Sequence, residues 1–123
     1  MGPDLRQWFT KYNDAFPNGP EAVAEFYSEP CINARMGVRL NHTRKDTADF
    51  FRQVLAKYRA QGWHHGEIVS METRSLGSKS AQATILWAYK NAENQTLWEW
   101  TFTYNLYKAN GGWKILLQTL HES

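Results

Sequence analysis

The chain has 123 residues, and its 14 lysines and arginines against 12 aspartates and glutamates give a formal charge of +2. This length predicts one domain over residues 1–123, and so small a charge argues against a nucleic acid or an acidic membrane as a partner. Hydrophobic residues make up 42% of the sequence and charged residues 21%, which excludes wholesale disorder.

The chain contains one cysteine, Cys31, so no disulfide can form within it and a cysteine-based zinc site is not expected. The histidines do not follow a metal-ligand spacing, and the sequence lacks a glycine-rich phosphate loop. We therefore expect neither a metal nor a cofactor. No segment approaches the about 18 apolar residues of a membrane span, and the N-terminus lacks a signal-peptide pattern. These features predict a cytoplasmic protein without a membrane partner.

Apolar residues at helical spacing predict three helices in the first half of the chain. The first covers about residues 4–15. The second is short and begins at Pro20, because proline is tolerated in the first turn of a helix. We expect Pro30 to end it, because the residue before a proline is pushed out of the helical region. The third helix covers about residues 44–61 and is capped by Gly62.

The strands are predicted on both sides of this third helix. Residues 31–40 read as two short strands joined by a turn at Gly37. After Gly62 the apolar period changes to two, which predicts strands over about residues 63–75, 79–90, 96–108 and 113–121. Helices followed by strands favour an α+β fold, with the helices on one face of a mostly antiparallel sheet.

Alternation along these strands places an aromatic row on one face, which we expect to be the inner, concave one. The turns predict pairing of Trp87 with Trp98 and of Tyr104 with Leu116. An aromatic box with a few polar points is typical of a small-molecule site. The expected pocket residues are Trp87, Trp98, Trp100, Phe102, Tyr104 and Gln118 from the sheet, with Tyr12, Asn33 and Arg35 opposite them.

The last strand is apolar on both faces near its middle. Alternation puts Trp113, Ile115 and Leu117 on one face, and Leu116 and Leu120 on the other. One face can cover the core, and the other needs a cover of its own. We expect a homodimer through the outer face of the sheet. The alternative is that Trp113 and Ile115 are simply half exposed.

This order of elements resembles the nuclear transport factor 2-like, or SnoaL-like, superfamily over nearly the whole chain. The resemblance includes Thr43-Arg44-Lys45-Asp46 at the start of the long helix and Gly112-Trp113-Lys114-Ile115 on the final strand. It implies three N-terminal helices in the concave face of a curved sheet, a cone-shaped α+β barrel with a pocket inside. Members include ketosteroid isomerases, polyketide cyclases, scytalone dehydratase, limonene epoxide hydrolase and non-enzymatic binding and association domains. The fold therefore does not decide the function.

The catalytic groups of these enzymes are missing at the expected positions. An isomerase needs a carboxylate base, but residues 31–35 contain no acid and Asn33 cannot take a proton. Glu99-Trp100-Thr101-Phe102 lacks the Arg-x-Asp of the epoxide hydrolase relay. The remaining candidates are Glu72 or His64 as a base, with Tyr27 or Tyr12 as a proton donor.

Three hypotheses follow. The first is a domain without strong catalytic machinery that binds a small, apolar or aromatic, ring-bearing ligand. The second is a lyase or isomerase of the polyketide cyclase, dehydratase or isomerase type that uses Glu72 or His64 with a tyrosine. The third is an association domain whose sheet face matters more than its pocket. An internal cavity would favour the first two, and the position of Glu72 would separate them.

Overall fold

The computed structural model describes residues 2–122, which form a six-stranded sheet and the helices that pack against it. The helices are α1 (Gly2–Ala15), α2 (Pro20–Ala24) and α3 (Arg44–Ala60), with a 3-10 turn, η1 (Phe16–Asn18), after α1. The strands are β1 (Tyr27–Ala34), β2 (Val38–Asn41), β3 (His65–Ser75), β4 (Ser80–Lys90), β5 (Thr96–Ala109) and β6 (Gly112–Leu120).

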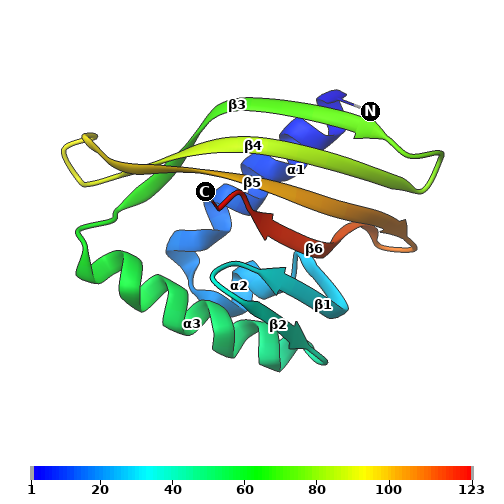
Figure 1. Cartoon of the computed structure of the whole chain (residues 1–123), viewed down its shortest axis with the longest axis horizontal. Coiled ribbons are helices and arrows are strands. Elements are labelled where there is room, and N and C mark those ends of the chain that lie inside the picture. The colour runs from blue at the N-terminus through cyan, green and yellow to red at the C-terminus, as the bar shows by residue number, and fades with distance from the viewer. Residues whose placement is uncertain (1, 123) are drawn as a thin grey trace.

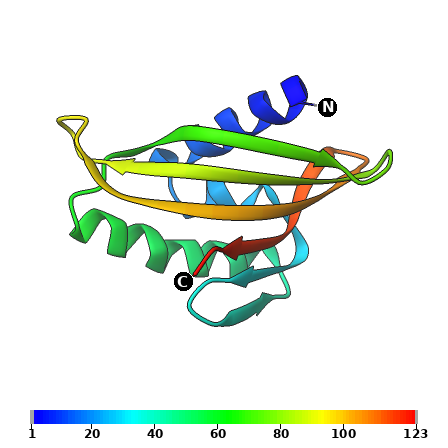
Figure 2. The ribbon, with the colours of Figure 1, turned by 45° about the horizontal axis from the view of Figure 1, so that its top comes forward.

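The strands lie in the order β2-β1-β6-β5-β4-β3, and each neighbouring pair is antiparallel except β1 and β6, which are parallel. The long strands β3, β4 and β5 arch over the helices, and α3 runs below the arch (Figures 1 and 2). The α+β class and the placement of the helices on the concave side are therefore confirmed. No helix within residues 2–122 is both long enough and apolar enough to cross a membrane.

Local sequence signals account for the ends of α3. The Thr43 side chain accepts a hydrogen bond from the Asp46 backbone, and the Asp46 carboxylate accepts one from the Thr43 backbone in return. At the other end Gly62 has a φ of +94°, the left-handed conformation that glycine adopts without strain. The glycine at this end agrees with the prediction from the sequence.

The expected role of Pro30 is wrong. The second helix already ends at Ala24, and Pro30 lies inside strand β1. It is accommodated because the pairing of β1 with β6 shifts its register between Tyr27 and Ile32. Proline lacks an N–H for the ladder, so it is tolerated where a strand departs from regular pairing.

The predicted pairing of β4 with β5 is wrong by two residues, but the predicted faces are right. Trp87 lies opposite Trp100 rather than Trp98. A shift of two residues keeps every side chain on its own face, because side chains alternate with a period of two. Ala83, Ile85 and Phe102 are accordingly buried on the inner face.

A bulge in β6 changes the faces of that strand. Leu117 pairs with Asn105 but Ile115 pairs with Leu106, which leaves Leu116 as an extra residue. Ile115 is consequently fully buried in the core, whereas Leu116 is 41% exposed. The predicted positions of these two residues are therefore reversed. The apolar character of both faces of β6 is in part explained by this bulge.

Candidate functional site

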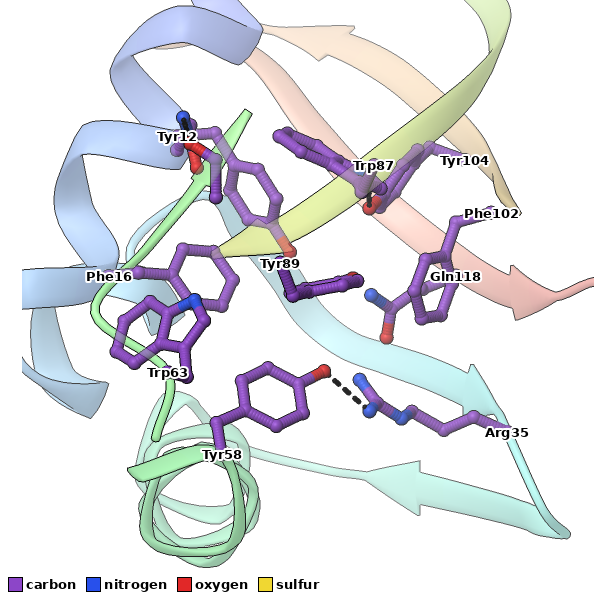
Figure 3. A pocket seen from close by; sticks show the side chains of 12 residues that line it. Tyr12, Phe16, Arg35, Tyr58, Trp63, Trp87, Tyr89, Phe102, Tyr104 and Gln118 are labelled. Carbon is purple, nitrogen blue, oxygen red and sulfur yellow. Dashed lines mark hydrogen bonds between the residues drawn. The ribbon is translucent and has the colours of Figure 1, made fainter. Parts of the chain in front are cut away.

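Aromatic side chains fill most of the interior of the cone. A central cavity of about 20 Å³ remains between the inner face of the sheet and the helices, which is the space of about one water molecule. Figure 3 shows phenol, indole and benzene rings crowding this space. The lining residues are Tyr12, Asn13, Phe16, Arg35, Tyr58, Trp63, Gly66, Trp87, Tyr89, Phe102, Tyr104 and Gln118.

A wider groove of about 510 Å³ lies beside this cavity and is open to solvent. Arg35 and Tyr58 line both spaces, so they stand at the boundary between them. The remaining residues of this space, which we call the mouth groove, come from α3, β5 and the β1–β2 turn. They are Met36, Phe50, Val54, Lys57, Gln61, Trp98 and Trp100.

The two indoles of β5 form an aromatic wall of the mouth groove. The Trp98 ring stacks on Tyr89 with centroids 4.9 Å apart, and it meets Trp100 in a T-shaped contact at 5.8 Å. Tyr58 of α3 completes this group, 5.4 Å from Trp98. The Trp98 Nε1 atom is buried and has no hydrogen-bond partner among the described residues.

Arg35 follows directly after β1, and its guanidinium lies within a cage of four rings. The guanidinium carbon is 5.2 Å from the Phe102 centroid, 5.5 Å from Trp100, 5.8 Å from Tyr58 and 5.9 Å from Phe50. Such contacts attract a cation through the negative faces of the rings. The guanidinium also donates a 2.7 Å hydrogen bond to the Tyr58 hydroxyl (Figure 3).

No carboxylate of the described residues forms an ion pair with Arg35. Burial on its own would lower the pKa of Arg35, but the contact with Tyr58 outweighs it and raises the pKa. Arg35 is therefore a permanent cation that is largely enclosed and has no counter-charge among residues 2–122. A charge in such a position is costly unless a partner of opposite sign binds to it.

A second polar group, a chain of three buried amides, leads from the surface to the cavity. Arg39 Nε donates to Asn41 Oδ1 (2.8 Å), Asn41 Nδ2 donates to Asn33 Oδ1 (2.8 Å), and Asn33 Nδ2 donates to Gln118 Oε1 (2.6 Å). A guanidinium can only donate, so Arg39 fixes the direction of every bond in the chain. The amide nitrogen of Gln118 is consequently the end turned toward the cavity, where Tyr104 is its neighbour.

The buried tyrosines are neutral hydroxyl groups rather than bases. Tyr12 and Tyr27 share a 2.7 Å hydrogen bond, and the Trp87 indole donates a 2.9 Å hydrogen bond to the Tyr104 hydroxyl. Burial raises the pKa of all three tyrosines well above the ordinary value. They fix their neighbours by hydrogen bonding at neutral pH, without carrying charge.

The structure divides the predicted pocket between the cavity and the mouth groove. Tyr12, Arg35, Trp87, Phe102, Tyr104 and Gln118 line the cavity, whereas Trp98, Trp100 and again Arg35 line the groove. Asn33 lines neither space, because its side chain is engaged in the amide chain behind Gln118. Its expected place in the pocket is therefore corrected.

The structure does not bring the proposed catalytic residues together. Glu72 lies opposite Thr84 on the outer face of the sheet and is exposed, whereas Tyr27 is buried in the core with Tyr12. His64 is exposed before β3, and its Nδ1 lies 3.0 Å from Nδ1 of His65. Strand alternation does not separate these two adjacent imidazoles, because β3 begins only at His65.

Several lining residues were absent from the predicted pocket. Tyr58 and Phe50 belong to the apolar stripe of α3, and Tyr89 continues the inward alternation of β4 after Trp87. These three could have been found by extending the patterns already recognised. Trp63 and Gly66 lie around the start of β3, where no periodic signal marks which way a residue points.

Comparison with known families agrees with this architecture. Residues 3–123 match the family model described as NTF2-like protein (DUF6841). The chain belongs to this family. The resemblance to the nuclear transport factor 2-like superfamily is thereby confirmed. No curated protein matches the sequence.

Several solved structures share the fold. An NTF-2 like protein of unknown function from Shewanella oneidensis has 17% identity and a TM-score of 0.74, covering 98% of each chain. A candidate calcium/calmodulin-dependent protein kinase II association domain from Xanthomonas campestris has 17% identity and a TM-score of 0.75, covering 98% of this chain and 86% of its own. A candidate aromatic ring hydroxylase from Novosphingobium aromaticivorans has 13% identity and a TM-score of 0.70, and the match covers 94% of this chain and 84% of the hydroxylase chain. At these identities the likeness concerns the fold alone.

Proposed function

We propose that this NTF2-like domain binds a small, mostly apolar, ring-bearing molecule in the mouth groove without transforming it chemically. The observation that carries the proposal is the half-buried aromatic wall of Trp98 and Trp100, which lines a space of about 510 Å³. Small-molecule sites typically enclose roughly 300–1,000 Å³ and combine apolar walls with a few polar groups. The central cavity, at about 20 Å³, is too small for such a ligand.

The titratable groups around the groove favour binding over catalysis. Its lining contains Arg35, Lys57 and Tyr58 but neither a carboxylate nor a histidine from the described residues. General acid–base catalysis requires a group that changes protonation near the working pH. The carboxylate that was the strongest catalytic candidate, Glu72, lies on the other face of the sheet.

Indole resonances provide a direct test of the binding site. We expect a planar neutral probe, 2-naphthamide, to shift the indole N–H signals of Trp98 and Trp100 in ¹H–¹⁵N spectra. Trp113, which is buried beside Lys108 outside the groove, should not respond. The variant Trp100→Ala should weaken binding roughly tenfold, because an aromatic contact is worth about 1 kcal/mol or more.

Tyr107→Ala is the matched control, because Tyr107 is also a partly exposed aromatic residue of β5 but lies outside the groove. This variant should bind the probe as the unmodified protein does. Shifts confined to Trp113, or an unaltered affinity after Trp100→Ala, would place binding elsewhere and contradict the proposal.

A second proposal concerns the outer face of the sheet. Ile32 pairs with Leu40 on one side and with Leu117 on the other, and Val38 on the edge strand β2 is 79% exposed. This row lacks charged side chains at its centre, so a second copy could pack on it without repulsion. A two-fold interface requires such a self-complementary surface. We propose that two chains associate through this row, while the groove remains free.

The variant Ile32→Lys tests this association, because it places a charge at the centre of the row. We expect sedimentation velocity to show a dimer for the unmodified protein and a monomer for Ile32→Lys. Val69→Lys, which alters an exposed apolar residue on the opposite edge strand β3, should leave the dimer intact. The proposal is rejected if sedimentation velocity shows that the unmodified protein is still a monomer at about 100 times the concentration used in the binding experiments.

A further inference from the structure

We propose that the ligand of the mouth groove is an aromatic acid, and that its carboxylate binds the guanidinium of Arg35. This inference rests on the function proposed above and adds the chemical class of the ligand. It follows from three observations, which concern the hydrogen-bonding capacity of Arg35, the charge of the groove and the arrangement of the surrounding rings.

Arg35 has more hydrogen-bond donors than the described residues satisfy. A guanidinium carries five N–H groups in a planar fork, and the described contacts of its side chain include one hydrogen bond, to the Tyr58 hydroxyl. The residue lines both the groove and the cavity, so the guanidinium is within reach of a molecule in the groove. A carboxylate matches the guanidinium fork with two parallel hydrogen bonds and supplies the missing negative charge.

The charges around the groove have one sign. Lys57 lies at its rim with Arg35 further in, and the guanidinium of Arg39 covers the Phe50 ring at 5.3 Å. The acids Glu99 and Glu122 line an adjoining depression that shares Met36 and Trp100 with the groove, and the Glu122 carboxylate accepts a hydrogen bond from the Met36 backbone. The lining of the groove itself holds cations and no carboxylate from the described residues, which raises the local concentration of anions and disfavours cationic ligands.

The aromatic cage itself argues against a cationic ligand, which is the main alternative to an acid. Clusters of aromatic rings often bind ligand cations such as quaternary ammonium groups, but here the position facing the rings is held by the protein's own guanidinium. A second cation would meet both repulsion and an occupied cage. Tyr89 stacks on one face of Trp98 and Arg35 lies over the Trp100 ring, so the ring of the ligand would contact the parts of these two indoles that line the groove.

One enclosed guanidinium matches the single charge of a carboxylate better than the double charge of a phosphate monoester.

The test compares two probes of nearly equal shape, 2-naphthoate and the neutral 2-naphthamide, by isothermal titration calorimetry at pH 7. We expect the acid to bind roughly 10- to 100-fold more tightly, because hydrogen bonds to charged groups are the strong ones. This comparison uses the unmodified protein and therefore does not depend on the folding of any variant.

The variants Arg35→Met and Lys57→Met then show which cation is responsible for the preference for 2-naphthoate over 2-naphthamide. Arg35→Met should abolish the difference between the two probes, whereas Lys57→Met, the loss of a more exposed cation, should reduce it only slightly. Thermal unfolding measured on each variant establishes that it is folded.

Each outcome has a separate meaning. If acid and amide bind equally to the unmodified protein, the aromatic-acid inference fails and the proposed function stands. If neither probe binds, the proposed function fails and the inference falls with it. If Arg35→Met stays folded and keeps the preference for the acid, the assignment of the carboxylate to Arg35 is overturned.

Discussion

Above about pH 10 the protein is expected to lose stability steeply, because four buried phenols keep their protons only while it is folded. Burial raises the pKa of Tyr12, Tyr27, Tyr89 and Tyr104 above the ordinary value of 10.0. The unfolded chain therefore releases protons that the folded chain retains. Their stabilising contribution is complete below pH 10 and declines from there upward. Each phenol contributes a slope of up to about 1.4 kcal/mol per pH unit, and four give roughly 5 kcal/mol per pH unit.

Urea unfolding at a series of pH values between about 8 and 11 measures this slope, with absorbance near 295 nm reporting phenolate. The variant Tyr27→Phe removes one of the four phenols and should make the slope about a quarter shallower. Ionisation of all six tyrosines near pH 10 in a protein that remains folded would show that these phenols are not protected.

Asn33→Asp is expected to destabilise the protein by about 3–5 kcal/mol, the usual cost of a buried charge without a partner. Asn33 is 1% exposed and stands in the middle of the amide chain, donating to Gln118 and accepting from Asn41. The carboxylate has no hydrogen to donate, so the Gln118 oxygen would face a second acceptor and a negative charge.

Urea unfolding at pH 7 measures this loss, with Asn110→Asp as the matched control. Asn110 lies in the exposed turn between β5 and β6, where the same substitution should change the free energy of unfolding by less than about 0.5 kcal/mol. A loss below about 1 kcal/mol for Asn33→Asp would mean that the amide chain is not maintained in solution.

The sequence was sufficient for the elements and insufficient for the details of their pairing. The helix α3 has a capping box, an apolar stripe and a terminal glycine, and these agree with one another, so its bounds were predicted closely. No comparable sequence signal marks the bulge at Leu116. Strict alternation assigns Ile115 and Leu116 to faces opposite to those they occupy, because one unpaired residue reverses the pattern on one side of it.

The candidate site could likewise be predicted from the sequence only in part. Strand alternation turns the rings of Trp87 and Phe102 inward, and both residues line the cavity together with Arg35. The cage around Arg35 requires Phe50 and Tyr58 from helix α3, a different element whose packing against the strands no pattern within one element records. The size of the cavity depends on how all of these side chains pack together, which no pattern along a single strand records.

The direction of the amide chain has a consequence for redesign. Arg39 is exposed, yet as an obligate donor it determines which end of the Gln118 amide is turned inward three hydrogen bonds away. An acceptor in its place, as in Arg39→Glu, would favour rotation of all three amides and turn a carbonyl oxygen toward the interior. The chemical preference of the interior could thus be inverted from the surface while every residue that touches the cavity is left unchanged.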